Sequence, residues 1–179
     1  LLFVSDLYAH SSFAETMYML TIPSYQFYEV MPIMENCAFH LSFEDQESDD
    51  ERVVILEEWR LGKGAMDRMR EKFFPVLLYG SKYPDRMPIG KEEILKTFPY
   101  QTIRDFYHAW YRPDNMALIV VGDIDPAVVE KSIQEHFGKA KNPKKAPIRQ
   151  EIQIPHHADS KAVVVTDKEM SYTQVRVTS

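Results

Sequence analysis

The chain has 179 residues, of which 45% are hydrophobic and 27% are charged, and its formal net charge is −6 at pH 7. This is the composition of an ordinary globular protein, and the acidic charge argues against a nucleic-acid-binding protein, which is usually basic. Cys37 is the single cysteine, which excludes an internal disulfide and a cysteine-rich metal site. No apolar run approaches the length of a membrane span.

The first forty residues predict a β-hairpin followed by a helix. Residues 13–22 are rich in Thr, Tyr, Met and Leu and predict a strand, with residues 3–10 as its hairpin partner. Apolar residues then recur at helical spacing over 27–38, after Ser24 as a candidate N-cap. Pro32 falls inside this helix, and we expect it to kink the helix.

Four further helices are expected after an acidic loop at 44–51. The first covers about 49–78, and its two glycines, Gly62 and Gly64, loosen it midway. The other helices are expected at 91–97, 102–110 and 127–137. The last of these is delimited by a proline at its start and by a glycine after its end.

The order of the elements favours an α+β fold. Three apolar or alternating segments of the second half predict strands, at 116–121, 162–166 and 173–178. Because the first two strands of the chain are close enough for a hairpin, we expect an antiparallel or mixed sheet with helices packed on one face, rather than a doubly wound parallel sheet. A basic stretch with prolines, 139–147, is the best domain boundary.

The histidines do not form a hydrolytic motif. No His-x-x-Glu-His or His-Glu-x-x-His pair occurs, and there is no Gly-x-Ser-x-Gly elbow, phosphate-binding loop or dinucleotide fingerprint. Each histidine is best interpreted as a surface or loop residue. The six are His10, His40, His108, His136, His156 and His157.

Two glutamates on one predicted helix draw attention. Glu51 and Glu58 are seven residues apart, so they project from one helical face about 10 Å apart along the axis. Val54 and Ile55 lie between them and would turn that face toward the protein. Carboxylates on such a face need a cation, an arginine or a metal.

The residues alone leave a simpler interpretation open. Glutamates are good helix formers that usually lie in solvent. Arg52 and Arg60 are also near enough in sequence to pair with Glu57 or with the other two acids.

Several segments resemble one family in the same order. Glu51-Arg52-x-Val54-x-x-Glu57-Glu58 resembles the segment that supplies the third metal ligand in the pitrilysin/insulinase-type zinc peptidases, the inverzincins, which include the processing peptidases. The other resembling segments are Ser12-Phe13-x-Glu15-Thr16-x-Tyr18, Arg86-x-Pro88-Ile89-Gly90, Phe106-Tyr107-x-x-Trp110-Tyr111-Arg112-Pro113-Asp114-Asn115-Met116 running into Val120-Val121-Gly122-Asp123, and Asp167-Lys168-Glu169.

The resemblance implies a zinc-dependent metalloendopeptidase with a half-shell α+β domain. In that family two histidines of an upstream His-x-x-Glu-His helix and a downstream glutamate bind zinc, and a metal-bound water attacks the peptide bond while the motif's glutamate acts as general base. Carried over, Glu58 is the metal ligand and Glu51 orients the site from behind it. The substrate peptide is expected as an added strand along an edge that includes Ala9, Ser11, Ser12 and Phe13.

The His-x-x-Glu-His helix is not among the 179 residues, and both ends of the sequence fall within apolar or alternating patterns. We therefore expect a fragment: 1–140 as the C-terminal two-thirds of the first peptidase-type domain, 141–160 as a linker, and 161–179 as the first strands of a second domain. The general-base glutamate is expected upstream. Alone, this fragment should neither hold zinc tightly nor cleave peptides.

The resemblance also implies partners and leaves an alternative. Expected partners are peptide substrates and a second homologous half-shell, in the same parent chain or on a partner subunit, and the bacterial members favour a periplasmic or cell-envelope location. Where the family usually has Asn-Ala in the edge strand, this chain has Tyr8-Ala9. That difference keeps open a non-catalytic homologous subunit that binds peptides or partners an active peptidase. An acidic α+β interaction domain of other ancestry is a third possibility.

Overall fold

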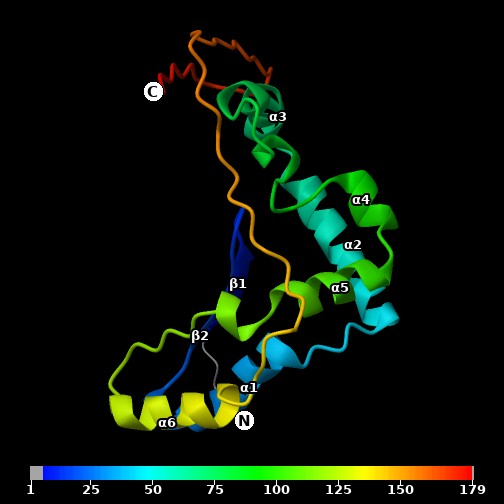
Figure 1. Ribbon diagram of the computed structural model, residues 1–179. Coiled ribbons are helices and arrows are strands. Elements are labelled where there is room, and N and C mark those ends of the chain that lie inside the picture. Colours follow the sequence, from blue (N-terminus) through cyan, green and yellow to red (C-terminus); the bar gives the residue numbers. More distant parts are fainter. Residues whose placement is uncertain (1–5, 179) are drawn as a thin grey trace. The chain divides into compact units, whose positions relative to one another are not determined.

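The computed structural model describes residues 6–178 and has a mixed α+β architecture (Figure 1). This confirms the fold class expected from the sequence. In chain order the elements are β1 (Asp6–Ser11), β2 (Thr16–Thr21), the 3-10 turn η1 (Ser24–Gln26), α1 (Phe27–Phe39), α2 (Asp45–Leu61), α3 (Ala65–Leu77), η2 (Tyr83–Asp85), α4 (Glu92–Thr97), α5 (Tyr100–Trp110), η3 (Pro113–Asn115) and α6 (Pro126–Phe137).

The chain divides into two compact units that are each discontinuous in sequence. The first unit combines the residues up to 48 with 98–149, and the second combines 49–97 with 150–179. Helix α2 begins in the first unit and continues in the second. The expected division into 1–140, 141–160 and 161–179 stays a prediction.

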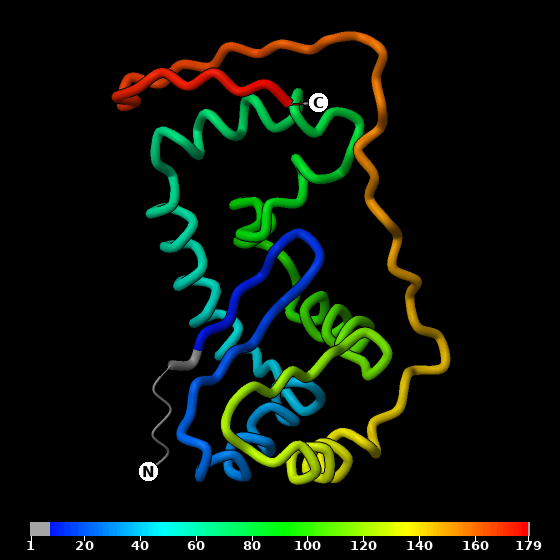
Figure 2. Tube along the Cα trace, turned by 90° about the vertical axis from the view of Figure 1, so that its left-hand side faces the viewer, coloured from blue at the N-terminus to red at the C-terminus, as the bar shows by residue number. Residues whose placement is uncertain are grey.

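The first unit contains the hairpin that the sequence predicts. Strands β1 and β2 are antiparallel and pair from Asp6 opposite Thr21 to Ser11 opposite Thr16, as two adjacent strands in Figure 2. The backbone N–H of Ser12 donates to the carbonyl oxygen of Glu15 at 2.9 Å and closes the turn. The second strand is shorter than the predicted 13–22, and residues 3–5 of its predicted partner lie outside the described part of the chain.

Helices α1 and α6 pack side by side in the first unit, and both views show it. The rings of Phe39 and Phe137 meet at 5.7 Å between centroids. Ser132 of α6 is 2% exposed, and such a small side chain allows close helix packing. The buried hydrophobic side chains of the described residues are Phe27, Val30, Met31 and Tyr107, so this unit holds the core.

Two details of α1 differ from expectation or refine it. Ser24 is not the N-cap of the helix, because it opens the 3-10 turn η1 and Gln26 is the N-cap residue of α1. Pro32 lies inside α1, which continues through it as one helix of 13 residues. A proline removes only one backbone donor, so a helix held by packing can contain it.

The long helix expected over 49–78 is two helices. Helix α2 ends at Leu61 and α3 begins at Ala65, with Gly62 and Gly64 between them. Glycine costs about 1 kcal/mol relative to alanine in a helix interior, and two glycines in three residues are enough to end the helix here. At its other end α2 begins at Asp45, so it takes in most of the expected acidic loop.

The strands expected at 116–121, 162–166 and 173–178 do not form within the described residues, where these segments have no regular secondary structure. A strand needs a neighbour that pairs with its backbone, and no described segment pairs with these. Their β-branched side chains are consequently open to solvent: Ile119 is 80% exposed and Val164 92%. No described helix combines the length and the apolar character that crossing a bilayer requires.

Candidate functional site

The two glutamates singled out by the sequence lie on α2 in the second unit. Glu51 and Glu58 are both exposed and are seven residues apart on the helix. Within residues 6–178 neither carboxylate makes a hydrogen bond or an ion pair. They are therefore available to a group that is not among the described residues.

The neighbouring charges are paired elsewhere. Arg60 binds Glu57, with Nη2 2.8 Å and Nε 2.9 Å from the carboxylate oxygen Oε2, and this bond raises the pKa of the arginine. Arg52 donates to the carbonyl oxygen of Leu95 and lies 3.5 Å from Asp49. The pairing that the sequence left open thus occurs at Glu57, between residues three apart.

The face that carries Glu51 and Glu58 turns only partly toward the protein. Of the two residues expected to turn it inward, Ile55 is half-buried but Val54 is 58% exposed, and the adjacent Val53 is 62% exposed. No described segment covers this part of α2 closely enough to bury the valines. The result is an exposed strip of helix with two free carboxylates and apolar side chains beside them.

The described residues fit one ligand of a zinc site but not a whole site. Zinc in a catalytic site takes three protein ligands, usually His, Asp, Glu or Cys. No group of three or more such side chains that could hold a metal occurs in residues 6–178. Two carboxylates about 10 Å apart along a helix also serve poorly as ligands of one ion. Glu58 is thus suited to a single ligand position, with Glu51 at a distance from it.

The predicted substrate edge lies in the first unit, on the hairpin. Hydrogen-bonded and non-hydrogen-bonded pairs alternate along an antiparallel ladder. Because Ser12 bonds Glu15, the alternation makes the pair of His10 with Met17 hydrogen-bonded. The backbone groups of Ala9 and Ser11 therefore point away from β2, where a further strand could pair with them.

The rest of the predicted edge is the turn after β1. Ser12 and Phe13 belong to this turn, and Phe13 is 40% exposed. Tyr8, which stands where the family has asparagine, is 55% exposed, and its ring lies 5.5 Å from that of His10. The structure thus places Ala9, Ser11, Ser12 and Phe13 together on the hairpin, and Glu51 and Glu58 together on α2.

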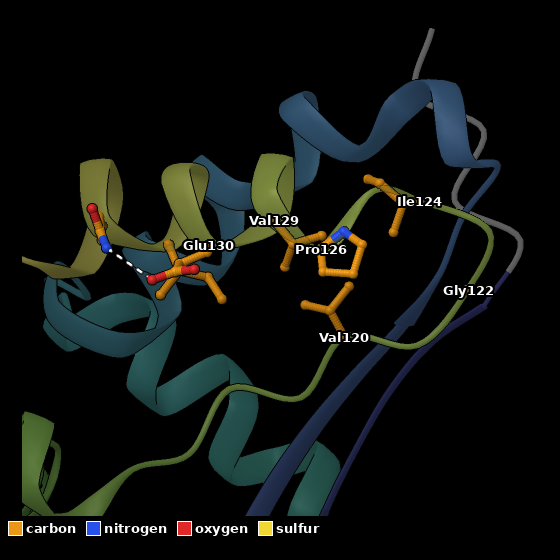
Figure 3. A pocket seen from close by; sticks show the side chains of 8 residues that line it. Val120, Gly122, Ile124, Pro126, Val129 and Glu130 are labelled. Carbon is orange, nitrogen blue, oxygen red and sulfur yellow. Dashed lines mark hydrogen bonds between the residues drawn. The ribbon is translucent and has the colours of Figure 1, made fainter.

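A shallow hollow lies between α6 and the segment that precedes it (Figure 3). It encloses about 330 Å³ and is lined mainly by apolar side chains, including Val120, Ile124 and Val129. The polar lining residues, Glu130 and Gln134, hydrogen-bond to each other at 3.3 Å. Glu130 is the one titratable side chain in this lining, so the hollow is mainly an apolar surface.

One titratable cluster was not found from the sequence. Glu35 of α1 lies 2.7 Å from His136 of α6 and 3.6 Å from His40. The hydrogen bond with His136 lowers the pKa of the Glu35 carboxyl. Because 101 positions separate Glu35 from His136, no local spacing pattern could have indicated the contact.

Comparison with known proteins adds the family. Residues 97–178 match a family model described as the Peptidase M16 inactive domain. The chain is 35% identical over 140 residues to the probable zinc protease PqqL of Haemophilus influenzae. The aligned region covers 76% of this chain and 15% of that protein. The chain thus spans a small part of this relative's length.

Solved structures agree with this relationship. The first half of the periplasmic protease PqqL from Escherichia coli superposes with a TM-score of 0.75 at 35% identity, covering 88% of this chain and 34% of that one. The ferredoxin protease FusC, solved with a ferredoxin of Arabidopsis, gives a TM-score of 0.77 at 34% identity and covers 82% of this chain and 16% of that one. This chain belongs to the M16, or pitrilysin-type, family of zinc peptidases.

Proposed function

We propose that this chain is part of a zinc-dependent metalloendopeptidase and that it supplies one metal ligand, Glu58, and a peptide-binding edge, β1. The observation that carries the proposal is the state of the α2 acids: Glu51 and Glu58 are exposed and unpaired, whereas the adjacent Glu57 is bound by Arg60. A free carboxylate at the position that resembles the family's ligand is what a metal site requires.

The two acids have different roles in this proposal. Glu58 would hold the metal through its carboxylate, and Glu51, seven residues earlier on α2, would orient the site from behind it. The zinc would supply Lewis-acid activation of water for peptide-bond hydrolysis. The two histidine ligands and the general base are assigned to the part of the longer protein that precedes this chain.

The hairpin holds the substrate in this proposal. The outward backbone groups of Ala9 and Ser11 pair with an extended peptide, and the turn residues Ser12 and Phe13 contact its end. Pairing through backbone atoms does not depend on the peptide's sequence, so this edge accepts many substrates. The complex of FusC with a ferredoxin supports protein-derived segments as the substrate class.

The whole protein is proposed by similarity to longer relatives. The solved first half of PqqL supports a second homologous half-shell, in the same parent chain or on a partner subunit. Its description as periplasmic supports a periplasmic or cell-envelope location. We also retain 1–140 as the remainder of the first domain, 141–160 as a linker and 161–179 as the start of the second.

A second candidate function is a non-catalytic subunit that binds peptides or partners an active peptidase. The bulky Tyr8 in the edge strand, which is 55% exposed, favours it. The two candidates differ in the upstream segment of the longer protein: an intact His-x-x-Glu-His supports the peptidase, and a degraded one supports the subunit.

The test is Glu58→Gln in the full-length protein, with zinc content and hydrolysis of a fluorogenic peptide measured together. Glutamine keeps the size but loses the charge, so bound zinc and activity should both fall at least tenfold. Glu57→Gln is the matched control on the same helix, because Glu57 is bound to Arg60. Unchanged activity and zinc content in Glu58→Gln would refute the ligand assignment.

A further inference from the structure

A hydrogen bond between two tyrosine hydroxyls connects strand β2 to the segment after α5. Tyr18 Oη and Tyr111 Oη are 2.7 Å apart and part-buried, although 93 positions separate the residues. Their rings meet edge-on at 6.4 Å between centroids. Both residues belong to the first unit, so the contact lies within one compact body.

Tyr111 is supported in turn by a buried tyrosine. The rings of Tyr107 and Tyr111 lie 4.4 Å apart, and Tyr107 is 4% exposed. The Tyr107 hydroxyl donates to the carbonyl oxygen of Cys37 at 2.9 Å and accepts from the backbone N–H of Leu41 at 3.4 Å. Three tyrosines thus link β2, α5 and the C-terminal end of α1.

Burial moves the pKa of two of these hydroxyls further above neutral pH. Desolvation raises the pKa of Tyr18 well above its usual value, and the hydrogen bond with Tyr111 raises it further. Burial likewise raises the pKa of Tyr107. A tyrosine hydroxyl is already protonated at neutral pH, so both phenols can donate a hydrogen bond there.

Tyr18 is on the strand that pairs with β1, whose outer side is the proposed peptide-binding edge. Tyr18 lies directly opposite Ala9 in the ladder, and the pairs on either side of it carry the inter-strand hydrogen bonds. A movement of Tyr18 is therefore transmitted to β1. Because a two-stranded hairpin is marginally stable by itself, its position depends on side-chain contacts with its surroundings.

We propose that Tyr18 and Tyr111 are positioning residues, whose mutual hydrogen bond fixes the β1 edge where a substrate peptide adds as a strand. The inference rests on the proposed function, because it assigns a role in peptide binding. Neither hydroxyl touches the reacting bond in this proposal. Their effect falls on the affinity for peptide rather than on the rate of cleavage.

The test compares Tyr18→Phe, Tyr111→Phe and the double variant in the full-length protein, with kcat, KM and Tm measured for each. A single substitution leaves the other part-buried hydroxyl without its partner, so Tm should fall and KM should rise. The double variant removes both hydroxyls, so its Tm should recover toward the wild-type value. Its KM should nevertheless stay raised, about three- to tenfold, with kcat within about twofold, since one hydrogen bond corresponds to roughly that factor in affinity.

The matched control is Tyr25→Phe, because Tyr25 is 77% exposed in the same unit. It should leave all three quantities unchanged. A double variant whose KM returns to wild type together with its Tm would show that the pair only stabilises the fold, and would overturn the inference. A KM that is unchanged in every variant would also overturn the inference.

A further measurement separates failure of the proposed function from failure of the Tyr18–Tyr111 inference. Binding of a labelled peptide to the wild-type protein is measured by fluorescence anisotropy alongside hydrolysis. A wild-type protein that neither binds nor cleaves peptides contradicts the proposed function and removes the inference with it. If the wild type binds but does not cleave, Kd takes the place of KM, and equal Kd values in the wild type and the double variant overturn the inference alone.

Discussion

Arg68 of α3 binds Asp167 through two hydrogen bonds of 2.8 Å each, although 99 positions separate the two residues. The same guanidinium binds Glu169 at 2.7 Å, and Asp167 also accepts the backbone N–H of Glu169 at 3.0 Å. One arginine therefore connects α3 to the segment 167–169 within the second unit. A two-bond contact of a guanidinium with a carboxylate is among the stronger polar contacts available.

Asp167→Asn is expected to lower the thermal midpoint of the protein at neutral pH. Arg68 holds the pKa of the Asp167 carboxyl well below its usual range. The stabilisation is therefore present in full above the unfolded-state pKa of about 4 and is lost as the pH falls through the lower folded-state value. The difference in Tm between wild type and variant should accordingly shrink in acid.

Thermal unfolding followed by circular dichroism from neutral to strongly acidic pH makes this measurement. Glu151→Gln is the control, because Glu151 is an exposed acid of the same unit with no partner among the described residues. A Tm difference for Asp167→Asn that does not change with pH would contradict the assignment.

His136→Gln is expected to destabilise the contact of α1 with α6 more than His40→Gln does. Glu35 lies 2.7 Å from His136 but 3.6 Å from His40, whose side chain is 57% exposed. Solvent screening limits the loss to about 0.2–1 kcal/mol for His136. Chemical denaturation of both variants at neutral pH gives the two losses of unfolding free energy. Equal losses would show that the shorter distance to Glu35 does not make the His136 contact the stronger one.

The stabilisation from the Glu35–His136 contact should also be lost at acidic pH. Its folded-state pKa is lowered by the bond to His136, so the contribution of the carboxylate is present above its unfolded pKa of about 4.3 and is lost below it. We expect Glu35→Gln and wild type to converge in stability as the pH falls below that value. Stability curves that stay parallel in acid would contradict this.

Gly80→Ala is expected to cost about 1–2 kcal/mol of unfolding free energy. Gly80 has φ +74°, and a Cβ there would stand 3.0 Å from Cγ of Pro155, so alanine meets both backbone strain and a close contact. Gly64→Ser is the matched control, because a Cβ at Gly64 would have no atom within 4 Å and serine is a good residue at this N-cap of α3. Urea denaturation should show a change of only a few tenths of a kcal/mol for Gly64→Ser, and equal costs would contradict the argument.

The 179-residue chain alone is expected to bind less than one zinc ion per molecule. Glu58 offers one ligand, and a zinc site needs three from the protein. Elemental analysis of the purified chain, with Glu58→Gln beside it, gives the answer. Stoichiometric zinc that is lost in Glu58→Gln would show that the chain completes a site by itself.

Local signals predicted the helices of the second half well. Helix α6 begins at Pro126 and is followed by Gly138, as expected, and the Asp125 side chain caps it by accepting the N–H of Ala127 at 2.9 Å. Helix α5 begins two residues before the expected 102 and ends at Trp110, as expected. Capping and proline effects act within one turn, so a sequence window contains them.

Contacts between distant segments were not predictable in the same way. The strands expected at 116–121 and 162–166 depend on a pairing partner, which their own residues do not specify. The spacing of Glu51 and Glu58 followed from helical geometry, but their exposure depends on what packs against α2. For the same reason the sequence indicated neither the bond of Tyr18 with Tyr111 nor that of Arg68 with Asp167.

The uncovered segment 116–121 has a practical consequence for every experiment on this chain alone. It is a run of six apolar residues, without charge or proline and without regular secondary structure, and Val121 is 91% exposed. Such segments associate between molecules through cross-β pairing. Heating concentrated samples of the isolated chain should therefore promote aggregation, so the thermal midpoints above are to be compared in dilute solution at one scan rate. A charged substitution such as Ile119→Lys, at a side chain that is 80% exposed, should delay that aggregation at little cost to folding.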